Sequence, residues 1–143
     1  LHRVLSELGA KNLLKTLDNI TANEKILQNE KFVSYAPKIK KLDAKLDFNS
    51  QASALEARIR GLAPKPGAWF EYKKERFKVF SAEVVEGNGK AGTIIDENLT
   101  IACGKKALKL LEIQRQGKHV MSVNDLLKGF KFKKGDNVNQ STH

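Results

Sequence analysis

The first twenty residues repeat apolar positions with the period of an α-helix. This pattern predicts an amphipathic helix over Leu1–Ile20. Its apolar positions are Leu1, Val4, Leu5, Leu8, Leu13, Leu14, Leu17 and Ile20. Such a helix must bury its apolar stripe against another element. Because the pattern is already present at residue one, we expect this helix to be the end of a domain that precedes it. Packing on the domain that follows is the alternative.

Polar residues interrupt the helical pattern, and the chain from about Thr21 to Asn49 has the character of a connector. Within it, Phe32–Tyr35 predicts a short extended stretch before Pro37. A run of lysines with interspersed aspartates follows. It fits a solvated linker as well as it fits a contact to an RNA backbone.

A second helix is predicted from the N-cap Ser50 to about Leu62. Its buried face comprises Ala52, Leu55, Ile59 and Leu62. The two arginines Arg58 and Arg60 point elsewhere, and each suits either a surface ion pair or a phosphate contact. Pro64–Gly67 then ends the helix and turns the chain.

Strand patterns dominate from Trp69 onward. Lys73–Lys74 marks a hairpin tip, after which Phe77 and Val79 alternate with Arg76 and Lys78 at the period of a half-buried strand. Further short strands follow at regular spacing, and a last short helix is predicted from Ser122 to Gly129. The basic tail over 131–136 is predicted to be mobile. Five or six short strands with a capping helix predict a small closed sheet, so the fold class is mainly β with flanking helices.

The charge balance restricts the partner. Lys and Arg number 26 against 16 Asp and Glu, which gives a net charge of +10 and favours a polyanion such as nucleic acid. We expect no membrane association, since no apolar run is long enough to span a bilayer. The single cysteine, Cys103, excludes an internal disulfide and a cysteine-based zinc site and points to the cytosol.

Catalytic patterns are not found. The turn Gly87–Gly89 lies between strands and is therefore no phosphate-binding loop. His2, His119 and His143 are far apart in the sequence, and Cys103 has the setting of a packing residue. We therefore predict no catalytic residue, cofactor site or metal site in this segment.

The order of several short motifs carries a family resemblance across essentially the whole chain. They are Leu1-His2, Leu8-Gly9-Ala10, Tyr35-Ala36-Pro37-Lys38-Ile39, Ile59-Arg60, Pro64-x-Pro66-Gly67-Ala68-Trp69-Phe70, Ile101-Ala102-Cys103-Gly104, Ala107-Leu108-x-Leu110-Leu111-x-Ile113-Gln114, Gly117-Lys118, Met121-Ser122 and Leu126-Leu127-x-Gly129. In this order they resemble the C-terminal part of the methionyl-tRNA formyltransferase family.

That resemblance implies a domain organisation. Residues 1–31 would hold the last helix of an α/β catalytic domain, 32–49 a basic interdomain linker, and 50–143 a C-terminal, tRNA-binding barrel of the oligonucleotide-binding type. The catalytic residues would precede Leu1, so the segment alone would be inactive. It would bind no cofactor, whereas the whole enzyme would use 10-formyltetrahydrofolate to formylate the amino group of methionyl initiator tRNA in translation initiation. The implied protein is a bacterial, cytoplasmic monomer.

The same resemblance, with the basic charge, suggests where tRNA would bind. The candidates are Lys38, Lys40, Lys41, Arg58, Arg60, Arg76, Lys78, Lys105, Lys106, Arg115 and Lys118. Such cations contact phosphates without reading the sequence. The aromatic residues Trp69, Phe70, Tyr72 and Phe77 fit a base-stacking platform, but alternation within strands favours the core.

Two alternatives remain at this stage. One is the C-terminal domain of another formyltetrahydrofolate-dependent formyltransferase or hydrolase, which needs no RNA and fits the basic charge less well. The other is a free-standing RNA-binding barrel, which the helix at the start of the chain disfavours.

Overall fold

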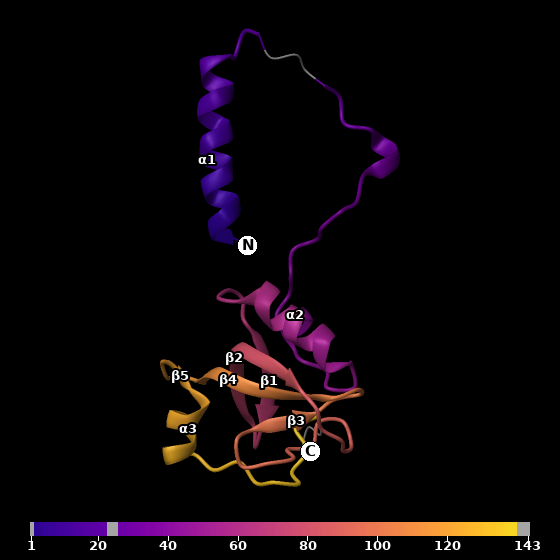
Figure 1. Ribbon diagram of the computed structural model, residues 1–143, viewed down its shortest axis with the longest axis vertical. Helices are drawn as coiled ribbons and strands as arrows, with labels where there is room; N and C mark the ends of the chain where they lie inside the picture. The colour runs from indigo at the N-terminus through magenta and orange to yellow at the C-terminus, as the bar shows by residue number, and fades with distance from the viewer. Residues whose placement is uncertain (1, 23–25, 140–143) are drawn as a thin grey trace. The chain divides into compact units, whose positions relative to one another are not determined.

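A computed structural model of the chain describes residues 2–22 and 26–139 and divides into two compact units, Leu1–Lys38 and Ile39–His143 (Figure 1). The division falls inside the segment that the sequence pattern assigned to a connector.

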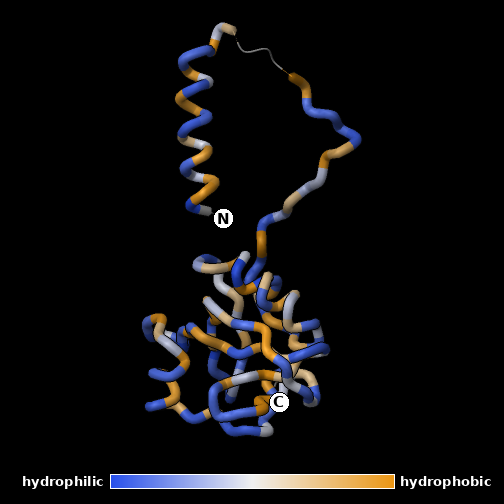
Figure 2. Tube along the Cα trace, viewed as in Figure 1, coloured by the Kyte–Doolittle hydropathy of each residue, from blue (hydrophilic) through white to orange (hydrophobic). Residues whose placement is uncertain are grey.

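The first unit contains helix α1, His2–Asp18, and a 3₁₀ turn η1, Glu30–Phe32. The predicted first helix is therefore confirmed over its described part. Hydrophobic residues recur along it (Figure 2), and its apolar side chains from Val4 to Leu17 are all more than half exposed. Phe32 ends η1 instead of starting an extended stretch, because the Asn29 side chain caps this turn by accepting a hydrogen bond from the Lys31 N–H.

The second unit is built on an antiparallel sheet. Its strands are β1 (Ala68–Tyr72), β2 (Glu75–Val85), β3 (Thr100–Ala102), β4 (Ala107–Arg115) and β5 (Val120–Ser122). They are ordered β1-β2-β4-β3. Strand β5 pairs with the same edge of β4 as β3 does, but near the other end of β4. Helices η2 (Leu42–Ala44), α2 (Ala52–Leu62) and α3 (Val123–Gly129) flank the sheet. The predicted fold class, mainly β with flanking helices, is confirmed.

The hairpin of β1 and β2 has the turn and the alternation of buried and half-buried residues that the sequence predicted. Lys73 and Lys74 both have positive φ, at 51° and 65°, as a two-residue turn between twisted strands requires. Phe77 and Val79 are fully buried, whereas Arg76 and Lys78 between and before them are half-buried. Register shifts between Val79 and Ala82 then bend β2, which lets the sheet curve around its core.

The core lies between the inward face of the sheet and helix α2. Phe70 stacks on Phe77 with ring centroids 5.7 Å apart, and Phe48 meets Phe70 edge-on at 6.0 Å. The predicted buried face of α2, from Ala52 to Leu62, closes this core.

Part of the predicted linker belongs to this core. Ala44, Leu46 and Phe48 are buried, and the Leu46 N–H donates to the Trp69 carbonyl at 2.7 Å. These three residues alternate with Lys45 and Asp47, a period-two pattern that sequence analysis attributed to a mixed-charge connector.

The start of α2 differs in one residue from the prediction. Gln51 is the N-cap and makes no side-chain capping bond, where Ser50 was expected. The first helical N–H, from Ala52, donates instead to the Lys105 carbonyl at 3.1 Å. The turn between β3 and β4 thus satisfies a donor that a capping side chain would otherwise satisfy.

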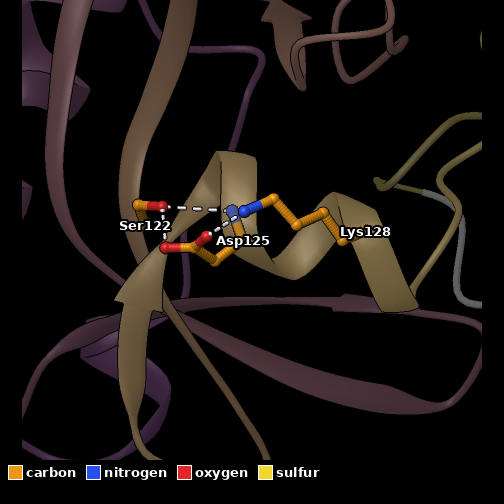
Figure 3. A network of polar contacts seen from close by, with 3 residues as sticks. All are labelled: Ser122, Asp125 and Lys128. Atoms are coloured by element: carbon orange, nitrogen blue, oxygen red, sulfur yellow. Dashed lines mark hydrogen bonds and ion pairs between the residues drawn. The ribbon is translucent and has the colours of Figure 1, made fainter.

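Helix α3 begins with the predicted cap (Figure 3). Ser122 Oγ accepts from the Asp125 N–H at 3.1 Å and donates to Asp125 Oδ2 at 2.7 Å, and Lys128 Nζ contacts Asp125 Oδ1 at 2.7 Å. Hydrogen bonds from Lys128 and then Ser122 lower the pKa of the Asp125 carboxyl below its ordinary value.

The predicted mobile tail is instead packed, so this prediction was wrong. Phe132 lies against Tyr72 and Phe77, with ring centroids 4.8 and 5.2 Å apart. The Tyr72 hydroxyl donates to Asp136 Oδ2 at 2.7 Å and accepts from the Lys133 N–H at 3.1 Å. One aromatic residue, Phe132, anchors this basic tail to the core.

Candidate nucleic-acid interface

Four polar side chains meet on the outward face of the sheet. Strand pairing places Lys78 of β2 directly opposite Gln114 of β4, and Arg76 precedes Lys78 by two residues on the same face. Gln116, which follows β4, donates its backbone N–H to the Arg76 carbonyl at 3.0 Å. These four residues, which we call the polar quartet, line a hollow of about 300 Å³ together with Arg115 and Gly117.

Arg76 is held in place by an aromatic ring. Its guanidinium carbon lies 4.1 Å from the centroid of the Trp69 ring, a cation–π geometry. Arg76 Nε is buried and has no hydrogen-bond partner among the described residues. The guanidinium is thus oriented by packing while one of its donors remains unused.

Trp69 also connects the quartet to the segment before α2. Its Nε1–H donates to the Lys41 carbonyl at 2.8 Å, and Lys45 Nζ lies 5.4 Å from its ring centroid. Lys40 and Lys41, two of the predicted contacts, are exposed at this point. Lys45 is partly neutralised by Glu71 at 3.5 Å.

The turn after β4 brings in another predicted contact. Gln114 Nε2 donates to the Lys118 carbonyl at 2.7 Å, which holds the turn through Gly117 against the end of the strand. The Lys118 side chain is exposed.

Arg115, predicted as a contact like Arg76 and Lys78, also borders the hollow, but its guanidinium lies on the inward side of the sheet. It pairs in register with the buried Phe77, and its guanidinium lies 4.7 Å from the centroid of the Phe130 ring. Arg115 Nε and a terminal nitrogen donate to the Glu75 carboxylate at 2.5 and 2.8 Å. The hydrogen bond from Arg115 lowers the pKa of Glu75, and the same bond raises the pKa of Arg115.

The two arginines of α2 contact groups outside the quartet. Arg60 pairs with Glu56 at 3.2 Å, whereas Arg58 donates to the Asp43 carbonyl and so ties α2 to η2. Arg60 thus forms the surface ion pair that was one of the two alternatives, whereas Arg58 contacts a backbone oxygen, which was neither of them.

Two predicted contacts of the second unit lie apart from the quartet, and a third belongs to the first unit. Lys105 and Lys106 precede β4, whose nine residues separate them by about 30 Å from Arg115 at its other end. Lys106 is also paired with Glu86 at 2.6 Å. Lys38 is the last residue of the first unit and is exposed.

The predicted aromatic residues lie in the core. Trp69, Phe70, Tyr72 and Phe77 are each at most 5% exposed, so the core interpretation is confirmed and no base-stacking platform forms from them. Sequence analysis missed Gln114 and Gln116, because the register that places them beside Arg76 and Lys78 is set by pairing between strands distant in the sequence.

Three further features of residues 2–22 and 26–139 bear on function: metal-ligand groups, the single cysteine and the length of the helices. No group of three or more His, Cys, Asp or Glu side chains there has a metal-binding arrangement. Burial raises the pKa of the Cys103 thiol to about 11, which keeps it protonated at neutral pH. In that same part of the chain, no helix combines the length and hydrophobicity needed to cross a bilayer.

Comparison with known proteins gives the family. The profile described as "Formyl transferase, C-terminal domain" matches residues 38–131, about two thirds of the chain. The chain belongs to this formyl transferase family. The match includes η2, α2, every strand of the sheet and the polar quartet.

Relatives within the family extend the similarity into the first unit. A methionyl-tRNA formyltransferase of Paramagnetospirillum magneticum is 41% identical over 138 residues, which cover 94% of this chain and 45% of that protein. The enzymes of Sinorhizobium medicae and Pelagibacter ubique are 40% and 34% identical, over 90% and 94% of this chain and 43% and 44% of their own lengths. The chain thus spans less than half the length of these curated relatives.

Solved structures support the fold. HypX from Aquifex aeolicus in complex with tetrahydrofolic acid matches with a TM-score of 0.61 at 19% identity, over 87% of this chain and 25% of that one. A variant of HypX from the same organism matches with a TM-score of 0.58 at 19% identity, over 85% of this chain and 24% of that one. These likenesses concern the fold of the formyl transferase C-terminal domain.

Proposed function

We propose that this chain is the C-terminal part of a methionyl-tRNA formyltransferase and that its role is to position the tRNA. The whole enzyme would transfer a formyl group from 10-formyltetrahydrofolate to the amino group of methionyl initiator tRNA. Family membership and relatives of that name at 34–41% identity support the proposal. We further propose that the enzyme is bacterial, lies in the cytoplasm and is a monomer.

The observation that carries the proposal is the polar quartet. It presents Arg76 and Lys78 side by side on an outward face, without a carboxylate paired to either among the described residues. The net charge of +10 supplies the wider field that attracts a polyanion. A curved antiparallel sheet with an outward basic face also suits an oligonucleotide-binding-like barrel.

We rank the candidate phosphate contacts by how far neighbouring carboxylates neutralise them. Lys40, Lys41, Arg76, Lys78 and Lys118 lie beside Trp69 or Gln114 and form the centre of the proposed surface. Arg60, Lys106 and Arg115 would contribute less, because they are paired with Glu56, Glu86 and Glu75. Lys38, Arg58 and Lys105 remain proposed contacts outside this centre. A phosphate would have to compete with those carboxylates.

Because this chain matches less than half the length of each relative, the functions of the whole enzyme would be divided between this part and the rest. The catalytic groups and the folate site would lie in the part of the enzyme that this chain does not match. Helix α1, with its exposed apolar stripe, would belong to that catalytic domain, and the residues before Ile39 would lead into the tRNA-binding domain. The segment alone would then be inactive and would bind no folate.

A salt titration of initiator-tRNA binding tests the proposal. If five phosphates are contacted, log K should fall against log salt with a slope of about −3.5 to −4.5. Absence of tRNA binding at low salt would remove the proposal and favour a formyltransferase or hydrolase that acts without RNA. Formylation of methionyl initiator tRNA by the full-length protein would be the matching activity assay.

A further inference from the structure

We infer that the polar quartet is a ribose–phosphate subsite, in which Gln114 accepts a hydrogen bond from an RNA 2′-hydroxyl while Arg76 and Lys78 bind the adjoining phosphate. This inference rests on the proposed RNA-binding function and deepens it. It assigns a role to a neutral residue and predicts selectivity for ribose.

The cationic half of the subsite is oriented before binding. The Trp69 ring fixes the plane of the Arg76 guanidinium at 4.1 Å, and the buried Arg76 Nε–H has no acceptor among the described residues. Because Nε is buried, a phosphate would be bound by the terminal nitrogens of this oriented guanidinium, whose donors match the geometry of the phosphate oxygens. Lys78 adds a second positive charge two residues along the same strand face.

The neutral half differs in its hydrogen-bonding character. Gln114 Nε2 is committed to the Lys118 carbonyl at 2.7 Å, while Gln114 Oε1 accepts no hydrogen bond from the described residues. What Gln114 offers a ligand is therefore an acceptor. A phosphodiester has no proton to donate, but a 2′-hydroxyl does, and that group distinguishes RNA from DNA.

The spacing of the two halves fits one nucleotide. Lys78 and Gln114 are direct cross-strand partners, so their Cβ atoms are about 5 Å apart. The hollow that they line with Arg76, Arg115, Gln116 and Gly117 measures about 300 Å³, at the small end of ligand-site volumes. It therefore suits a single sugar–phosphate unit of a larger RNA surface. Glu71, the cross-strand partner of Arg76, forms its ion pair with Lys45 at 3.5 Å and not with Arg76.

The test compares a short RNA duplex with the same duplex carrying 2′-fluoro riboses, which keep A-form geometry but cannot donate. The chain should bind the ribose duplex about two- to tenfold more tightly, the range for one neutral hydrogen bond. The variant Gln114→Met removes the acceptor and should abolish this preference. A merely structural role in holding the Lys118 turn would weaken binding to both duplexes alike and leave the preference intact.

Two matched variants complete the experiment. Gln51→Met changes another exposed glutamine, which makes no capping bond and lies beside Lys105 at the far end of β4, and it should retain the preference. Arg76→Ala should weaken binding of both duplexes by a similar factor. If the chain binds initiator tRNA but shows no preference for ribose, the inference is wrong and the proposed function stands. If it binds no tRNA at all, both the inference and the proposed function are wrong.

Discussion

The guanidinium of Arg76 lies 4.1 Å from the centroid of the Trp69 indole ring, and the same indole donates through Nε1 to the Lys41 carbonyl at 2.8 Å. One buried side chain therefore fixes both a cation of β2 and the backbone of the basic segment before α2. Its contribution to RNA binding would be indirect, since only 5% of Trp69 is exposed.

Replacing Trp69 should accordingly affect both folding and RNA binding. Trp69→Phe keeps an aromatic ring but leaves the Lys41 carbonyl without its donor, so we expect the free energy of unfolding to fall by about 1–3 kcal/mol. Denaturant unfolding followed by circular dichroism would measure this change. RNA affinity, measured where the variant is fully folded, should fall several-fold because Arg76 and Lys41 lose their support.

A control for that experiment is Phe70→Leu, which alters the core on the inward side of β1. It should lower stability without changing RNA affinity. Unchanged RNA affinity of folded Trp69→Phe would show that the indole stabilises the fold but does not arrange the basic surface.

Removing a central cation should change the salt dependence of RNA binding. Arg76→Ala and Lys78→Ala should each reduce the magnitude of the slope of log K against log salt by about 1, because one phosphate contact is lost. The control is Lys90→Ala, which removes an exposed positive charge beyond the far end of the eleven-residue strand β2. A slope that falls equally in all three variants would indicate a diffuse field instead of a defined surface.

The ion pair between Glu75 and Arg115 should make stability depend on pH. Because the hydrogen bond from Arg115 lowers the folded-state pKa of Glu75 below its ordinary 4.5, ionised Glu75 stabilises the fold above that pH. The stabilisation is lost as pH falls through the lowered folded-state pKa. The melting temperature of the wild type should therefore exceed that of Glu75→Gln at pH 7, and the difference should shrink below about pH 4.5.

Glu97→Gln serves as the control for that series, because Glu97 is exposed and has no ion-pair partner among the described residues. Its melting temperature should follow that of the wild type over the same pH range. A constant difference between Glu75→Gln and the wild type down to pH 3 would contradict the assignment of the pH dependence to this pair.

Two glycines should respond in opposite ways to alanine. A Cβ at Gly104 would overlap the Asn49 carbonyl oxygen, so Gly104→Ala should destabilise the fold by about 1–3 kcal/mol or more. At Gly61, inside α2, a Cβ has no neighbour within 4 Å. Gly61→Ala should stabilise by about 0.4–1 kcal/mol, since alanine restricts the unfolded chain and favours the helix. Thermal unfolding of the two variants tests both signs, and loss of stability in Gly61→Ala would contradict this account.

The features predictable from sequence are those that depend on neighbouring residues. The buried face of α2 follows from helical spacing, and the turn at Lys73–Lys74 and the inward Phe77 and Val79 follow from strand alternation. Ser122 was predictable as a cap because its partner, Asp125, lies three residues away.

The features that were missed depend on contacts between distant residues. Leu46 and Phe48 enter the core because the backbone beside them pairs with Trp69, and Glu75 neutralises Arg115 from forty positions away. One error was avoidable, since counting by twos from the apolar Ile113 places Arg115 on the inward side. The pairing of Lys78 with Gln114 had no such local signal.

Trp69 is the only tryptophan in the sequence, and it touches the cation that the proposed RNA surface depends on. The protein therefore carries an intrinsic fluorophore at the site of interest. Any ligand that draws the Arg76 guanidinium away from the indole ring should alter the emission of that single chromophore, so binding can be followed optically without attaching a label.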